Sequence, residues 1–169
     1  MRFGFAARVI TIVFAGALPL TVHAADAAKA PAAKADASSL ARGKYLVVIA
    51  GCNDCHTAGY AMTNGKIPEK DWLAGDRLGW RGPWGTTYAV NLRQYMQTLT
   101  ETQWVAKAKA LETRPPMPWD NIRAMTVHDL RAIHRYVRHL GPAGEAAPAY
   151  VPPDKEPLPP YVTFPAPPK

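Results

Sequence analysis

The sequence predicts an all-α domain, in which a few helices are joined by long loops. Three stretches carry apolar residues at helical spacing, and each begins at a serine or threonine that can act as an N-cap. No stretch alternates between apolar and polar residues as a half-buried strand does, and no internal repeat is found. With 169 residues, 48% of them hydrophobic and 20% charged, the chain can build one globular core.

The helices are expected over residues 38–51, 100–111 and 126–141. The first has Ser38 or Ser39 as its N-cap and stops at a glycine. The second and third begin at Thr100 and Thr126, each followed three positions later by a partner suited to a capping box. The stretch 57–99, rich in glycine and tryptophan, and the proline-rich stretch 114–125 are expected as loops.

The N-terminus has the pattern of a secretory signal peptide. Arg2 and Arg8 precede an apolar run that ends at Val22, and Ala24 supplies a small residue at the expected cleavage position. An uncleaved anchor is the alternative, but so short a run spans a bilayer poorly. We therefore expect export to the periplasm, with residues 1–24 removed and no transmembrane segment in the mature chain.

The mature chain is expected to have three parts. Residues 25–37 contain eight alanines and are expected as a flexible leader, and residues 38–141 form the domain. Residues 142–169 hold ten of the 17 prolines together with several aromatic residues. This tail is expected to lie extended across the domain or to dock on a partner, in a polyproline-like conformation.

The strongest chemical signal is the motif Cys52-Asn53-Asp54-Cys55-His56, which contains the only two cysteines of the chain. Two thiols on one helical turn can each bond a vinyl group of the same porphyrin, and the histidine that follows can coordinate its iron. A disulfide or redox pair that merely precedes a histidine is the alternative, but a thioredoxin-like site requires a βαβ pattern. A zinc site requires further thiols or a distant pair of histidines one helical turn apart, and His128, His134 and His139 do not supply such a pair.

With this motif, the chain resembles the class I cytochromes c, the family of small helical domains with one covalent haem c. The resemblance covers residues 38–141, where Gly43 with Val47 and Ile133 with Tyr136 match the crossing of the first and last helices. The stretch 85–92 and the Met-Pro-Trp sequence after it are similar to haem subunits that serve bacterial periplasmic dehydrogenases. The resemblance implies a cytochrome c fold, a few helices wrapped with loops around one haem.

Met117 is the predicted distal ligand of the iron, opposite His56. It lies between Pro116 and Pro118, which restrict the backbone, and class I cytochromes place their methionine in this region. The weaker candidates are three other methionines, Met62, Met96 and Met125, and three histidines, His128, His134 and His139.

Ligation by His56 and Met117 would fill both axial positions and predicts outer-sphere, one-electron transfer rather than enzymatic catalysis. The resemblance implies a periplasmic carrier between a dehydrogenase and the respiratory chain, with the dehydrogenase, a terminal oxidase or another cytochrome as partner. The alternative is a haem enzyme or gas sensor of the peroxidase kind, in which the methionine is displaced. The lysines and arginines form no run, so nucleic acid is not an expected partner.

The remaining candidates concern the surroundings of the haem. The five tryptophans are expected in the haem pocket or the core, and the resemblance makes Arg81, Trp84 and Tyr88 candidates for binding the propionates. Loss of residues 1–24 leaves 18 basic and 13 acidic residues, a formal charge of +5. Basic residues expected near the haem edge predict docking on an acidic partner; they are Lys66, Lys70, Arg77, Arg81, Arg114 and Arg123.

Overall fold

The structure is a computed structural model that describes the backbone of residues 24–165 and the side chains of residues 36–165. The predicted signal peptide therefore lies outside the described residues, except for Ala24. The α-helices are α1 (Ala24–Ile49), α2 (Cys52–His56), α3 (Leu92–Tyr95), α4 (Glu101–Lys109), α5 (Trp119–Ala124) and α6 (Val127–Leu140). The short 3-10 helices are η1 (Ala61–Thr63), η2 (Glu69–Asp71) and η3 (Met96–Thr98), and the strands are β1 (Gly79–Gly82), β2 (Gly85–Tyr88) and β3 (Tyr161–Thr163).

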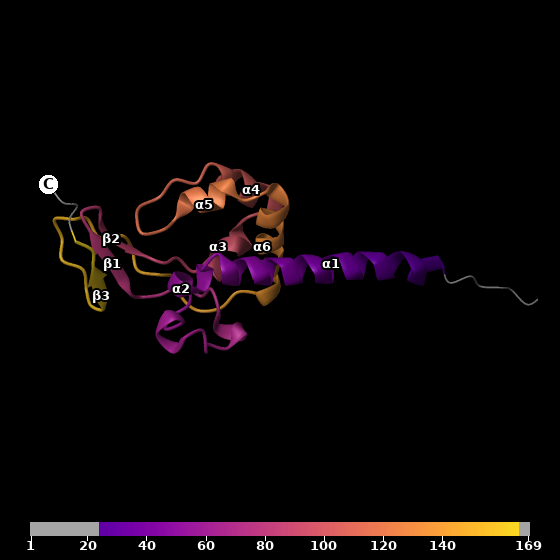
Figure 1. Cartoon of the computed structure of the whole chain (residues 1–169), viewed down its shortest axis with the longest axis horizontal. Helices are drawn as coiled ribbons and strands as arrows, with labels where there is room; N and C mark the ends of the chain where they lie inside the picture. The colour runs from indigo at the N-terminus through magenta and orange to yellow at the C-terminus, as the bar shows by residue number, and fades with distance from the viewer. Residues whose placement is uncertain (1–23, 166–169) are drawn as a thin grey trace, which may run out of the picture.

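The prediction of an all-α fold is wrong, because the helices are accompanied by a three-stranded sheet at one end of the molecule (Figure 1). Strands β1 and β2 form an antiparallel hairpin, and β3 lies parallel to β1 on its other edge. These strands are only three or four residues long, and β1 and β2 contain three glycines between them. Such short, glycine-rich strands show no alternation in the sequence, and β3 comes from the proline-rich tail.

Helix α6 and the C-terminal half of α1 form the centre of the domain and cross at a steep angle (Figure 1). Gly43 lies at the crossing, where a Cβ atom would stand 2.1 Å from the carbonyl oxygen of Ala132 and 2.6 Å from the Cβ of Tyr136. The two backbones can approach this closely because the glycine has no side chain. Around the crossing, Val47 and Val137 are fully buried.

The predicted N-terminal starts of the second and third helices are confirmed by their capping bonds. Thr100 accepts a hydrogen bond from the backbone of Gln103 at 3.2 Å, and the Gln103 side chain accepts one from the Thr100 backbone at 2.9 Å. Thr126 caps α6 by accepting from the Asp129 backbone at 3.1 Å. Both caps depend on residues three positions apart, and a sequence pattern is sufficient to locate them.

The first helix is longer than predicted, because α1 already begins at Ala24 and includes residues 25–37, which were expected as a flexible leader. Alanine has the highest intrinsic helix propensity, and eight of these thirteen residues are alanines. Within the part of the chain that the structure describes, no helix combines the length and the apolar character that crossing a membrane requires.

Candidate cofactor site

The two cysteines and the histidine of the motif lie on α2, directly after a sharp turn at Gly51. Gly51 has a φ of 66°, in the left-handed region that suits glycine, and this turn separates α2 from α1. The two thiols are free and lie in half-buried positions three residues apart on the short helix. The motif is therefore held on one helical turn, as the haem interpretation requires.

Burial raises the pKa of both thiols. The pKa of Cys52 rises to about 11, mainly through loss of solvent, and that of Cys55 rises for the same first reason, with a further contribution from the charge of Asp54. Thiol–disulfide exchange requires a thiolate, and catalytic Cys-x-x-Cys pairs have a lowered pKa. The shifts at Cys52 and Cys55 run in the opposite direction from those of such catalytic pairs.

His56 is held in one orientation by a backbone carbonyl. Only 7% of the residue is exposed, and its Nδ1 lies 2.8 Å from the carbonyl oxygen of Val90. Because a carbonyl can only accept, Nδ1 must carry the proton and Nε2 keeps its lone pair. Burial lowers the pKa of His56, which favours the neutral imidazole. A second bond that fixes the ring and its tautomer is typical of histidines that bind metals.

The end of α2 is fixed by a buried network of hydrogen bonds. The Thr57 hydroxyl donates to the side-chain oxygen of Asn53 at 2.7 Å and accepts from the backbone N–H of Leu73 at 2.8 Å. The N–H of Gly75 donates to the carbonyl of His56 at 2.8 Å. Asn53, Thr57 and Leu73 are each at most 1% exposed, so this network ties the motif firmly to the loop that follows it.

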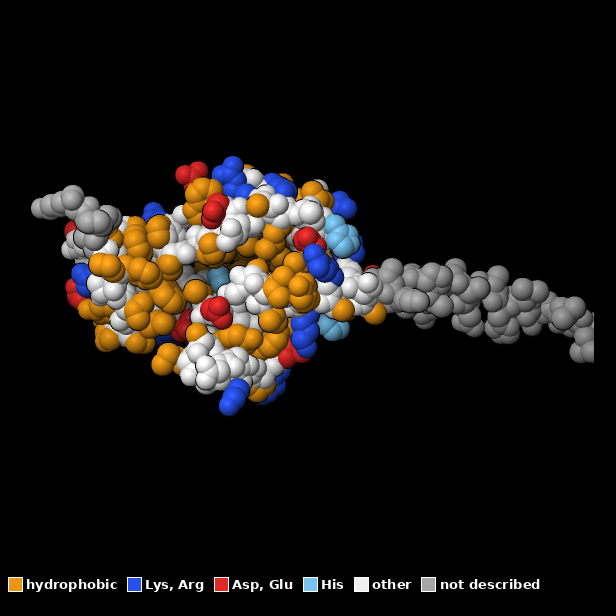
Figure 2. Space-filling view, viewed as in Figure 1, with side chains coloured by type: hydrophobic (Ala, Val, Ile, Leu, Met, Phe, Trp, Pro, Cys, Tyr) orange, Lys and Arg blue, Asp and Glu red, His pale blue; other side chains and the backbone are white. Residues whose placement is uncertain are grey.

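His56 and Cys55 line a cavity of about 440 Å³, a size that is usual for sites that bind a small molecule or cofactor. The molecular surface is hollowed between the sheet and the helices, and histidine atoms are visible inside the hollow (Figure 2). Cys52 is not in the lining; it packs against the core. The other residues of the lining are Trp80, Thr87, Tyr88, Ala89, Val90, Leu92, Tyr95, Trp104, Lys107, Leu111, Thr113, Arg114, Pro116, Met117, Pro148 and Tyr150.

The structure brings Met117 into the same cavity as His56, and among the described residues Met117 is the one methionine of its lining. The three other candidate methionines lie elsewhere: Met62 is 88% exposed, Met96 is buried in the core, and Met125 packs against the core. A thioether and an imidazole therefore contribute to one partly apolar cavity, and these are the two ligands of a histidine–methionine haem site.

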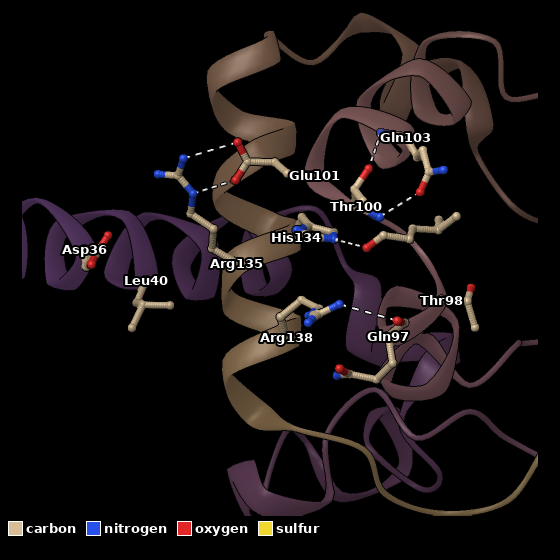
Figure 3. A pocket seen from close by; sticks show the side chains of 11 residues that line it. Asp36, Leu40, Gln97, Thr98, Thr100, Glu101, Gln103, His134, Arg135 and Arg138 are labelled. Carbon is tan, nitrogen blue, oxygen red and sulfur yellow. Dashed lines mark hydrogen bonds and ion pairs between the residues drawn. The ribbon is translucent and has the colours of Figure 1, made fainter.

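The three alternative histidine ligands lie away from this cavity. His134 is buried on α6 with its Nε2 3.0 Å from the carbonyl of Leu99, while His128 and His139 are exposed. His134 lines a second, more open hollow of about 630 Å³ between α1, α4 and α6 (Figure 3). There Arg135 forms an ion pair with Glu101, so the polar groups of that hollow largely bind each other.

Of the three residues proposed to bind the haem propionates, the structure places one in the cavity and two outside it. Tyr88 lines the cavity, but Arg81 forms an ion pair with Glu156 at 2.5 Å, and Trp84 packs on Phe164 with ring centroids 5.5 Å apart. Neither Arg81 nor Trp84 is in the cavity lining, and the residues that they contact, Glu156 and Phe164, both come from the proline-rich tail.

Trp80 is a better candidate that the sequence did not distinguish from the other tryptophans. It lines the cavity, and its indole N–H is buried without a hydrogen-bond acceptor among the described residues. Buried donors in folded proteins are nearly always paired, so this one fits a ligand that brings an acceptor, such as a carboxylate. The donor, the aromatic walls and the His56–Met117 pair together fit a haem.

No protein-family model, curated protein or solved structure matches the chain. Among the described residues, no three side chains of histidine, cysteine, aspartate or glutamate come together in a metal-binding group. A haem iron takes four ligands from its porphyrin and only two from the protein, so the His56–Met117 pair is the set that the haem interpretation needs.

Proposed function

We propose that this chain is an exported electron carrier with one covalent haem c, attached through Cys52 and Cys55. His56 and Met117 would be the axial ligands, with Cys55, His56 and Met117 in the cavity lining and Cys52 one turn away on α2. The observation that carries the proposal is the meeting of His56 and Met117 in one cavity, with His56 Nδ1 bonded to the Val90 carbonyl at 2.8 Å.

The surrounding residues would support this function in three ways. The Val90 carbonyl keeps the imidazole of His56 in the tautomer that can act as a ligand. The aromatic side chains of Trp80, Tyr88 and Trp104 reduce the access of water to the cavity. When bound, a haem supplies reversible one-electron chemistry, and two protein ligands on its iron leave no open position for a substrate. The chain would therefore transfer electrons and catalyse no reaction by itself.

The proposed partners are redox proteins of the periplasm: a dehydrogenase as donor, and a terminal oxidase or another cytochrome of the respiratory chain as acceptor. Two basic side chains, Lys107 and Arg114, line the cavity and are exposed. Arg81, by contrast, is already paired with Glu156, and Lys70 lies 3.9 Å from Asp71. The free positive charge at the cavity therefore comes chiefly from the side of Met117, which suits an acidic partner surface.

The test is the intact mass of the protein expressed in the periplasm together with the haem attachment machinery. We expect one haem added to a chain that begins near Ala25, and no haem on a variant in which Cys52 and Cys55 are both replaced by alanine. An unmodified mass, or a disulfide in place of the haem, would contradict the proposal.

Carbon monoxide separates the carrier from a haem enzyme or gas sensor. If Met117 stays bound to the reduced iron, the optical spectrum should change slowly or not at all when carbon monoxide is added. Rapid and complete binding by the unmodified protein would instead favour the sensor or peroxidase alternative, in which Met117 leaves.

A further inference from the structure

The C-terminal segment after α6 (residues 142–165, here called the tail) is bound to the domain along its length. Directly before it, the buried guanidinium of Arg93 donates to the carbonyls of Leu140 and Gly141 and fixes the point from which the tail begins. The side-chain amide of Asn91 donates to the carbonyls of Ala143 and Glu145 at 2.7 and 3.0 Å. At its end, β3 pairs with β1. A freely moving linker would make no such set of bonds.

In its middle, the tail passes close to the turn between β1 and β2. The backbones of Val151 and Thr86 exchange two hydrogen bonds, at 2.7 and 3.0 Å. Gly85 has a φ of 93°, and a Cβ atom there would stand 2.5 Å from the carbonyl oxygen of Val151 and 2.8 Å from the hydroxyl of Tyr150. The turn and the tail can therefore approach only because residue 85 is glycine.

This approach places Tyr150 in the wall of the cavity and against the loop that carries Met117. The guanidinium carbon of Arg114 lies 3.8 Å from the centroid of the Tyr150 ring, a cation–π contact. The hydroxyl of Tyr150 donates to the carbonyl of Trp84 at 2.8 Å, which fixes the ring from its other end. Tyr150 and Arg114 both line the cavity, together with Met117.

The Met117 loop needs such contacts, because residues 111–118 form neither helix nor strand. Two side-chain contacts join this loop to the sheet and the tail. The Thr87 hydroxyl donates to the carbonyl of Pro115 at 2.8 Å, and Arg114 stacks on Tyr150. A segment with few contacts opens locally at low cost, so each of these contacts restricts the position of Met117.

We infer that Tyr150 is a positioning residue: by holding Arg114, it keeps the loop 111–118 over the cavity and Met117 in reach of its ligand position. The role of Met117 as a ligand rests on the proposed function. The contact between Tyr150 and Arg114 is independent of that function. It also assigns a function to the tail, which becomes one wall of the cofactor site.

The test uses the full-length holoprotein and four variants, Tyr150→Ala, Tyr150→Phe, Arg114→Gln and, as control, Leu158→Ala. Leu158 also lies in the tail but is 82% exposed and outside the cavity lining. Two quantities are measured: the rate of carbon monoxide binding to the reduced protein, and amide hydrogen exchange in residues 111–118. Neither requires a redox partner.

We expect Tyr150→Ala and Arg114→Gln to raise both rates about two- to fivefold, the factor that corresponds to loss of a cation–π contact at an exposed site. Tyr150→Phe keeps the ring and should change them less, and Leu158→Ala should not change them. Combining Tyr150→Ala with Arg114→Gln should add little to either single change, because both remove the same contact.

Two results would overturn the inference: Tyr150→Ala behaving like Leu158→Ala, or the two single effects adding fully in the double variant. If Tyr150→Ala does not fold, the test relies on Arg114→Gln, which should fold because the Arg114 side chain is exposed. Unchanged rates of carbon monoxide binding and hydrogen exchange in Arg114→Gln would then refute the inference. If the unmodified chain takes up no haem, the proposed function fails, but hydrogen exchange in the loop still tests whether Tyr150 holds it.

Discussion

The crossing of α1 and α6 gives the most quantitative prediction, the effect of Gly43→Ala on stability. The new Cβ atom would stand 2.1 Å from the carbonyl oxygen of Ala132, whereas ordinary van der Waals contact begins at 3.4 Å. The obstructing atom belongs to the backbone of α6 and cannot rotate away. The two helices must therefore move apart by roughly 1 Å or more at this point.

Two opposing contributions set the magnitude. Alanine is about 1 kcal/mol better than glycine within a helix, which favours the variant. Overpacking costs about 1–3 kcal/mol, and the higher end applies where a rigid atom is met and neighbouring contacts open. Val47 and Val137, fully buried near the crossing, would lose part of their contact with each other's helix. The packing cost is larger, and a net loss of about 2 kcal/mol is expected.

The assay is denaturant unfolding of the holoprotein, followed by far-ultraviolet circular dichroism. The matched control is Ala41→Gly, because Ala41 is exposed two residues earlier on the same helix. That variant measures the propensity difference alone, and its value is added to the Gly43→Ala result to give the packing cost. A Gly43→Ala protein as stable as the parent, or more stable, would refute the reasoning from close approach.

Three further predictions concern the ligand, the partner and the partly exposed Glu69 contact. Met117→Ala should abolish the near-infrared sulfur-to-iron band of the oxidised protein and lower its reduction potential, and the assignment is wrong if Met125→Ala removes the band instead. Electron transfer to an acidic partner should slow as salt rises, and Lys107→Glu should slow it further with an unchanged haem spectrum; a rate that is independent of salt would remove electrostatic docking. Hydrogen bonds from Lys44 and Tyr136 lower the pKa of Glu69, so its contribution is present at neutral pH and lost as the pH falls through that lowered pKa. Unfolding at several pH values should therefore show Glu69→Gln to be less stable than the parent by up to about 1 kcal/mol at pH 7, with the two converging in acid; a constant difference would contradict this.

The parts of the fold that the sequence predicted correctly depend on neighbouring residues. The caps at Thr100 and Thr126 are completed within one helical turn, and α4 and α6 follow from them. The motif at residues 52–56 is local in the same sense, and its role in haem attachment stays a prediction. For these features, the residues that decide the structure lie within a few positions of one another, so the sequence alone is sufficient to predict them.

The features that the sequence missed depend on residues that lie far apart. Strand β3 forms only because the tail returns to β1, and no pattern within residues 161–163 indicates that pairing. The acceptor of His56 Nδ1 is the carbonyl of Val90, which any residue at that position could supply. The indole N–H of Trp80, which is buried and has no acceptor within the described part of the chain, distinguishes it from the four other tryptophans only once its surroundings are known.

The missed sheet and the predicted site are connected through the tail. The bond between Val151 and Thr86 and the pairing of β3 with β1 keep the tail on the sheet, and Tyr150 lies between these anchors and Arg114. The tail therefore closes the cavity at the side of Met117, whereas the motif on α2 provides the side of His56. The half of the proposed site that contains His56 is indicated by a short motif, because residues 52–56 share one helical turn. The opposite half depends on the tail, whose contacts with Thr86, β1 and Arg114 join residues far apart in the sequence and are not indicated by any local pattern.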